Sequence, residues 1–208
     1  LSEQLENSEI SASELMASTL DRIDAVNGDV NAIVSLRARA ELMEDAKAAD
    51  TSDRKGWLHG IPIAIKDLAN AKGLPTSMGS PLFAGQIAQE DDILTARLRA
   101  AGAIVIGKTN TPEFGLGSHT FNPVFGATRN PYGHGQTAGG SSGGAAVALA
   151  TGMVSVADGS DMMGSLRNPA AWNNVYGMRP TWGLVPSEPK GETFLHQIAT
   201  NGPMARNP

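Results

Sequence analysis

The chain has 208 residues, a formal net charge of −5 and no cysteine. It has no basic run interleaved with aromatic residues and no apolar run near the roughly 20 residues of a membrane span, so we expect neither nucleic acid nor a membrane as a partner. The missing cysteines exclude disulfides and thiolate chemistry and fit a reducing compartment, from which we predict a cytoplasmic protein.

The N-terminal part of the chain is patterned as helix, strand and helix. Ser11 stands three residues before Glu14, which is the spacing of a capping box, and the apolar positions that follow predict a helix that stops at Gly28. Residues 31–36 predict a short strand, and residues 39–50 predict a second, less apolar helix.

The next segments again alternate between strand and helix. Residues 60–65 are an apolar run that ends at Lys66, as in a buried strand. Asp92 is a suitable N-cap for a helix that stops at Gly102, and the apolar residues 103–107 follow at once as another strand. This order predicts an α/β fold.

The C-terminal half gives weaker signals. Residues 109–135 read as a long loop, which in a compact protein is more often functional than idle. Residues 145–152 predict a helix and residues 153–157 a short strand, whereas little regular structure is predicted beyond Trp182.

Two glycine patterns suggest nucleotide binding but have the wrong context. "GAIVIGKT" at 102–109 fits a phosphate loop, yet its central residues favour a strand and no helix pattern follows. "GHGQTA" at 133–138 fits a dinucleotide fingerprint, but the residues before it predict a turn. Nucleotide binding is therefore the weakest alternative function.

A serine hydrolase with a histidine base is also poorly supported. Ser141 lies in a G-x-S-x-G pattern, but no good strand precedes it and only His196 follows it. His59, His119 and His134 fall in predicted loops without the spacing of metal ligands, so we interpret them as ordinary polar residues and expect no metal.

Lys66 is chemically more interesting because it ends a buried strand. One interpretation is a lysine that extends out of the strand end into water. The other is a buried amine whose pKa falls toward neutrality, so that it can act as a base toward a serine.

Five ordered blocks together carry a resemblance: "GIPIAIKD", "GKTNTPEFG", "TAGGSSGGAAVALATG", "GSDMMGSLRNPAA" and "GPMAR". They resemble the amidase signature family of Ser-Ser-Lys amide hydrolases. The resemblance implies a mixed β-sheet flanked by helices. It also implies Lys66 as the base, Ser141 as a bridging serine at a cis peptide bond, and Ser165 as the nucleophile.

The resemblance implies supporting roles as well. The backbone N–H groups expected to form the oxyanion hole are those of Met162, Met163, Gly164 and Ser165. The residues expected to support the site are Gly140, Ser142, Asp161 and Arg167, with Ser142 capping the following helix and Arg167 bracing the nucleophile loop. Methionines stand at 162 and 163 where the family usually has Thr-Gly. The N–H of Met163 can serve as a donor only if its backbone angles are ones that a residue other than glycine tolerates.

Because family members are longer, residues 1–208 are expected to be the N-terminal portion of a single domain that continues beyond residue 208. The function implied is hydrolysis of a small carboxylic amide through an acyl-serine, without a cofactor. Two alternatives remain, a glutaminase component of an amidotransferase complex and a non-catalytic binding module on the same scaffold. A homodimer is an open option for the assembly.

Overall fold

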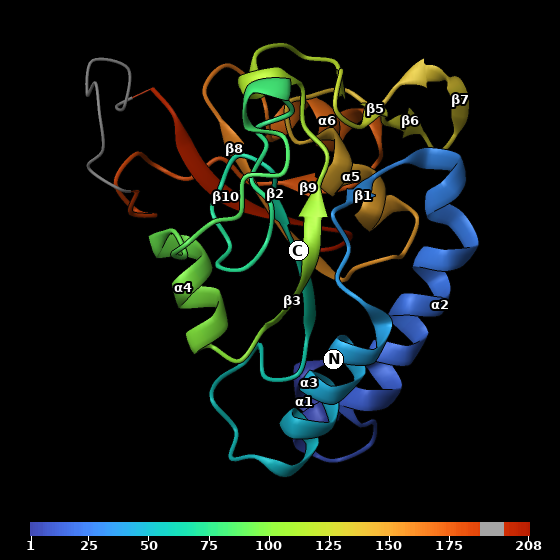
Figure 1. Cartoon of the computed structure of the whole chain (residues 1–208), viewed down its shortest axis with the longest axis vertical. Coiled ribbons are helices and arrows are strands. Elements are labelled where there is room, and N and C mark those ends of the chain that lie inside the picture. The colour runs from blue at the N-terminus through green and yellow to red at the C-terminus, as the bar shows by residue number, and fades with distance from the viewer. Residues whose placement is uncertain (188–197) are drawn as a thin grey trace.

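The computed structural model describes residues 1–187 and 198–208 (Figure 1). The helices are α1 (Ser2–Glu6), α2 (Ala12–Val30), α3 (Arg39–Thr51), α4 (Ile93–Ala100), α5 (Gly143–Ala150) and α6 (Arg167–Trp172), with 3-10 turns at Pro81–Phe83 and Glu113–Gly115. The strands are β1 (Ile33–Val34), β2 (Pro62–Lys66), β3 (Ile104–Thr109), β4 (Phe121–Asn122), β5 (Gly126–Ala127), β6 (Arg129–Asn130), β7 (Gly133–Thr137), β8 (Val156–Asp161), β9 (Tyr176–Gly177) and β10 (Thr200–Ala205).

The predicted α/β class is confirmed, but the described strands form several small sheets. In the first, β3 pairs in parallel with β2 and antiparallel with β1. In the second, β10 pairs antiparallel with both β8 and β9. β2 and β8 lie side by side, and β4–β5 and β6–β7 form two further ladders. The site described below lies where β2 meets β8.

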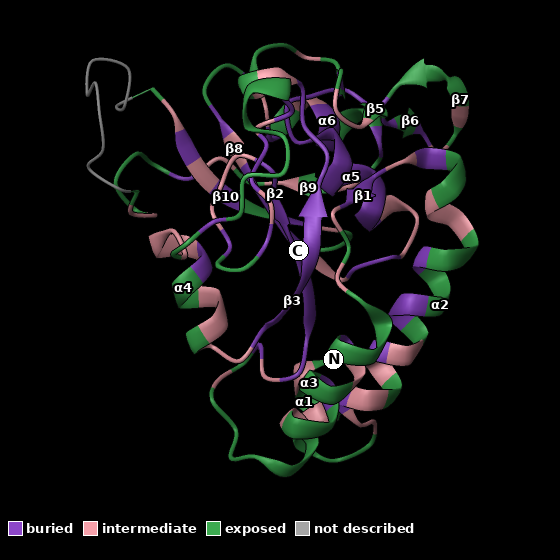
Figure 2. Cartoon of the chain, in the orientation of Figure 1, coloured by how far each residue is buried: buried purple, intermediate pink, exposed green. Residues whose placement is uncertain are grey.

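Helices cover the first sheet from two sides. In Figure 1, α2 lies to the right of β2 and β3, α3 lies below them, and α4 lies to their left. β3 is buried along its whole length, as Figure 2 shows. One apolar cluster joins α2 to α5, and another lies between β2, β3 and α4. The carboxyl ends of β2 and β3 are thereby fixed in a rigid core.

The glycine-rich start of α5 packs directly on backbone. A Cβ on Gly144 would fall on the backbone nitrogen of Asn110 and 2.7 Å from the carbonyl oxygen of Ala32. The N–H of Gly144 donates to the carbonyl of Asn110 at 3.2 Å. The absence of a side chain at this position therefore allows α5 to begin in direct contact with the backbone that follows β3.

Local predictions in the N-terminal half hold with one shift. The capping box of Ser11 and Glu14 is present, with the Ser11 hydroxyl accepting from the Glu14 N–H at 3.0 Å. The helix does not stop at Gly28, which has room for a side chain and stays helical. It ends at Val30, because Asn31 adopts the left-handed conformation with φ 51°.

Three predictions in the C-terminal half are wrong. Residues 109–135 contain several short strands, and residues 133–137, which we judged a poor strand, form β7. The strand predicted at 153–157 is β8, which begins at Val156 and continues into polar residues. β10 lies in the region beyond Trp182, where little regular structure was predicted. Within the described ranges, no helix combines the length and the apolar character needed to cross a membrane.

Candidate active site

Lys66 ends β2 with its side chain buried and surrounded by hydroxyl groups. Its Nζ donates to Oγ of Ser141 at 2.7 Å, to Oγ of Ser142 at 2.9 Å and to Oγ of Ser160 at 3.0 Å. The residue is only 1% exposed. In the described part of the chain, no carboxylate oxygen lies within 4.0 Å of this nitrogen. Among the described residues, the partners of this buried amine are therefore hydroxyl groups and not a carboxylate, and Lys66 does not extend into solvent.

This environment favours the neutral amine. Burial lowers the pKa of Lys66 to about 7, and the negative charges of Asp158 and Asp161 only partly oppose that shift. A neutral amine has a lone pair that can accept a proton from a hydroxyl group. Lys66 is thus able to act as a base near neutral pH.

The second buried lysine, Lys108 on β3, has a different environment. Its Nζ lies 3.5 Å from a carboxylate oxygen of Asp67 and donates to the carbonyl of Ala69 at 2.6 Å and the hydroxyl of Thr76 at 3.1 Å. Burial lowers its pKa as well, but Asp67 opposes the shift from direct contact. Lys108 fixes the segment after β2, whereas Lys66 faces hydroxyl groups that can exchange a proton with it.

Ser141 lies in the turn between β7 and α5. The peptide bond between Gly140 and Ser141 is cis, as the resemblance implies. The Ser141 side chain is buried, and a Cβ on Gly115 would lie 3.7 Å from its Oγ, so the segment around Gly115 borders the site. The turn thus delivers the Ser141 hydroxyl to the amine of Lys66.

Ser142 differs from its predicted role. It is the residue before α5, but its side chain makes no capping hydrogen bond. Its hydroxyl accepts instead from Lys66 and donates to the carbonyl of Ser160 at 3.3 Å. The start of the helix does not need this hydroxyl as a cap, because the N–H groups of Gly143 and Gly144 already donate to the Thr120 hydroxyl and to the carbonyl of Asn110.

The loop of residues 162–166, in which the nucleophile is expected, is organised by the carboxylate of Asp161. That carboxylate accepts from the N–H of Gly164 at 2.8 Å and of Leu166 at 3.1 Å. Arg167 donates to it through Nε and Nη2, each at 3.0 Å. Burial alone would raise the pKa of Asp161, but these donors and the charge of Arg167 hold it well below its usual range. Asp161 thereby links the backbone of the loop to the guanidinium of Arg167.

Ser165 lies in this loop and is half-buried. Its carbonyl accepts from the N–H of Ser142 at 3.1 Å, which fixes its backbone beside the residue after Ser141. The structure therefore brings the hydroxyls of Ser141 and Ser142 to the amine of Lys66, and it places the backbone of Ser165 beside Ser142.

The predicted oxyanion donors fall into two groups. The N–H of Gly164 already donates to Asp161, so it is not free in this geometry. Among the described residues, no hydrogen bond engages the N–H groups of Met162, Met163 and Ser165. Gly164, with φ 112°, takes the unusual backbone angle, whereas Met163 does not adopt a positive φ. The methionine is thus compatible with a free N–H, and its side chain is 84% exposed.

Two residues of β8 that were not predicted also face Lys66. Ser160 contacts its amine, and the Asp158 carboxylate accepts from its backbone N–H at 2.8 Å. The polar residues at alternate positions 158 and 160 were the available signal, because alternate residues of a strand share one face. The strand was predicted at the apolar residues 153–157, so it ended before Asp158 and Ser160.

Two of the histidines form hydrogen bonds within the protein. His59 bonds to the carbonyl of Ala49 at 3.0 Å, and His119 bonds to the Thr137 hydroxyl at 2.9 Å. Within residues 1–187 and 198–208, no three metal-ligating side chains cluster. His196 lies outside the described residues.

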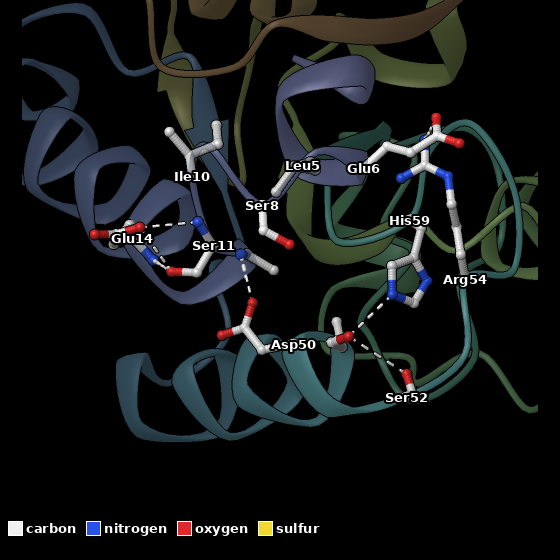
Figure 3. A pocket seen from close by; sticks show the side chains of 12 residues that line it. Leu5, Glu6, Ser8, Ile10, Ser11, Glu14, Asp50, Ser52, Arg54 and His59 are labelled. Atoms are coloured by element: carbon white, nitrogen blue, oxygen red, sulfur yellow. Dashed lines mark hydrogen bonds and ion pairs between the residues drawn. The ribbon is translucent and has the colours of Figure 1, made fainter.

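A cavity of about 300 Å³ between α1, α2 and α3 lies away from Lys66 (Figure 3). Its polar side chains bind neighbouring protein groups, as Ser11 does with Glu14 and Asp50 does with the N–H of Ala12 at 2.6 Å. The Ser11–Glu14 pair is the capping box of α2, whereas the Lys66 cluster brings hydroxyl groups to a buried amine.

Comparison with known proteins agrees with this geometry. The model of the Amidase family matches residues 14–207. The chain is 42% identical over 190 residues to a glutamyl-tRNA(Gln) amidotransferase subunit of Corynebacterium jeikeium, covering 89% of this chain and 38% of that protein. It is 40% identical over 201 residues to an acylamidase of Rhodococcus erythropolis, covering 95% of this chain and 42% of that protein.

Solved structures give the same result. A bacterial aryl acylamidase of the amidase signature family superposes with a TM-score of 0.90 at 34% identity, over 99% of this chain and 44% of that one. The chain therefore belongs to the amidase signature family. It spans about two fifths of the length of the relatives that it matches.

Proposed function

We propose that the protein hydrolyses carboxylic amides through a covalent acyl-serine, with Lys66 as base, Ser141 as proton relay and Ser165 as nucleophile. The observation that carries the proposal is the 2.7 Å hydrogen bond between the buried Nζ of Lys66 and Oγ of Ser141. The pKa of Lys66, lowered to about 7 by burial, supports it, because a large fraction of the base is then neutral under physiological conditions.

The proton moves in two directions during the reaction. Neutral Lys66 accepts the proton of Ser141 while Ser141 accepts that of Ser165, and Oγ of Ser165 bonds to the carbonyl carbon of the amide. The protonated lysine then returns a proton through Ser141 to the leaving nitrogen, and the C–N bond breaks. Water then gives a proton to the same base and its oxygen bonds to the acyl carbon. The bond between that carbon and Oγ of Ser165 breaks, Ser165 regains the proton through Ser141, and the carboxylate leaves.

The negative charge that forms on the carbonyl oxygen requires donors that are already in place. We assign this role to the N–H groups of Met162, Met163 and Ser165, and we leave out Gly164 because its N–H donates to Asp161 at 2.8 Å. One such donor contributes about a hundredfold to a thousandfold in rate.

The proposal is tested by hydrolysis of simple amides, such as the 4-nitroanilides of short acyl groups. The full-length protein is expected to release 4-nitroaniline without added metal or cofactor, and Ser165→Ala is expected to remove that activity. Ser155→Ala, ten residues earlier in the loop before β8, is the matched serine control and should keep it. Equal activity of Ser165→Ala and the unmodified protein would contradict the assignment of the nucleophile.

A second candidate is the glutaminase component of an amidotransferase complex. It is favoured by the 42% identity to the glutamyl-tRNA(Gln) amidotransferase subunit of Corynebacterium jeikeium. The methionines at 162 and 163, in place of the Thr-Gly expected for that class, count against it. Hydrolysis of glutamine only in the presence of partner proteins, with no activity on anilides, would select this candidate over the first.

A further inference from the structure

Asp158 and Ser160 hold the two ends of Lys66 from one face of β8. Oδ1 of Asp158 accepts from the backbone N–H of Lys66 at 2.8 Å, and Oγ of Ser160 accepts from its Nζ at 3.0 Å. The N–H of Lys66 points away from β3, since it is the N–H of the next residue, Asp67, that bonds the carbonyl of Thr109 at 3.1 Å. Asp158 thus supplies the acceptor that a neighbouring strand would otherwise provide.

Asp158 is also placed to act through its charge. It is 6% exposed, and it lines a cavity of about 140 Å³ whose other side chains, among them Leu58, Ile63 and Leu98, are apolar. Burial raises the pKa of the Asp158 carboxyl, whereas the N–H of Lys66 and the charges of Lys66 and Lys108 oppose that shift and favour the carboxylate. In such a poorly solvated environment a carboxylate affects a neighbouring amine more strongly than it would at the surface.

The other charged groups around Lys66 are already paired. Asp161, on the opposite face of β8, binds Arg167 and the nucleophile loop. Lys108 on β3 is paired with Asp67 at the end of β2. The start of α5 presents only the hydroxyls of Ser141 and Ser142 to Lys66. Asp158 is the carboxylate whose hydrogen bond goes to Lys66 itself.

We propose that Asp158 is a positioning residue for Lys66: its carboxylate fixes the backbone of Lys66 against β8, and its negative charge sets the pH at which the amine gives up its proton. This inference rests on the proposed function, in which Lys66 is the base. A negative charge stabilises the protonated amine, so it moves deprotonation of Lys66 to higher pH. It thereby offsets part of the effect of burial.

The test is the pH dependence of the rate at which a fluorophosphonate labels the full-length protein. Asp158→Asn keeps an oxygen acceptor for the Lys66 N–H but removes the charge. We expect the acid limb of its profile to move to lower pH by about one pH unit, with a plateau close to that of the unmodified protein. Asp158→Leu removes the acceptor as well, and its plateau is expected to fall about tenfold or more.

The control is Asp50→Asn. Asp50 also binds a backbone N–H, that of Ala12 at 2.6 Å, but it lies at the end of α3 away from Lys66. A merely structural role predicts that Asp158→Asn and Asp50→Asn lose stability and leave the acid limb in place. If Asp158→Asn does not fold, Asp158→Ser carries the same prediction.

An acid limb that is unchanged, or that moves to higher pH, in the uncharged variants overturns the inference while the proposed function stands. An unmodified protein that is not labelled at any pH overturns the proposed function, and the inference with it. A shift to lower pH in the Asp158 variants alone supports both.

Discussion

The side-chain nitrogen of Lys66 lies 2.7 Å from the hydroxyl oxygen of Ser141, although 75 positions separate the two residues in the sequence. Both side chains are buried, so water does not compete for this hydrogen bond. The contact joins the parallel pair β2–β3 to the glycine-rich turn before α5. Substitutions at either residue should therefore act mainly on the chemistry of proton transfer.

Ser141 and Ser142 are neighbours that both contact Lys66, and they should differ sharply in importance. Ser141→Ala breaks the proposed relay and is expected to lower kcat by about two to four orders of magnitude. Ser142→Ala removes one hydrogen bond of 2.9 Å to Lys66 and is expected to cost about tenfold. The measurement is anilide hydrolysis by the two variants, with circular dichroism as the control for folding. Similar losses in both variants would argue against a relay through Ser141.

The lowered pKa of Lys66 predicts how stability depends on pH. The pKa is about 7 in the folded protein and near its ordinary value of 10.5 in the unfolded chain. Between these values the unfolded state binds more protons, so the free energy of unfolding rises with pH by up to about 1.4 kcal/mol per pH unit. This contribution of Lys66 to the free energy of unfolding is complete above pH 10.5, the pKa in the unfolded chain, and is lost as the pH falls toward 7.

Lys66→Met lacks the titrating group and isolates this effect. The free energy of unfolding of the variant, minus that of the unmodified protein, should decrease steadily from pH 7 to pH 9. Urea unfolding of both proteins at three pH values measures it, and taking the difference cancels the titration of all other groups. A difference that stays constant with pH would mean that Lys66 is not buried as a neutral amine.

The close packing of α5 predicts opposite effects of the same substitution at two glycines. Gly144→Ala places a Cβ on the backbone of Asn110 and 2.7 Å from the carbonyl oxygen of Ala32, and it should destabilise the protein by about 3 kcal/mol. Gly28→Ala, in α2, meets nothing within 4 Å and should stabilise the protein by up to about 1 kcal/mol. Urea unfolding measures both. A Gly144→Ala variant as stable as the unmodified protein would show that the start of α5 can move away from the backbone of Asn110 and Ala32.

The sequence predicted local structure well where the signal was itself local. The capping box of Ser11 and Glu14 depends on neighbouring residues, so its pattern was sufficient. The end of α2 was misplaced because Asn31, rather than Gly28, takes the left-handed conformation, and either residue type is suited to it. The short strands β4 to β7 were missed because two-residue pairings depend on tertiary contacts and leave no periodicity.

The site was predicted mainly through its resemblance to the amidase signature family. The residues alone left two interpretations of Lys66, and only the fold shows that its amine is buried among three hydroxyls. Ser160 and Asp158 were not predicted, because β8 becomes polar where its side chains serve the site. A polar strand end of this kind has the composition of a loop.

The most direct test of the account is the site of covalent labelling by a fluorophosphonate, located by mass spectrometry of the digested full-length protein. The account predicts one adduct, on the peptide that contains Ser165, in the unmodified protein and in Ser155→Ala, and none in Ser165→Ala. An adduct of full yield in Ser165→Ala, or an adduct on another serine of the unmodified protein, would contradict it.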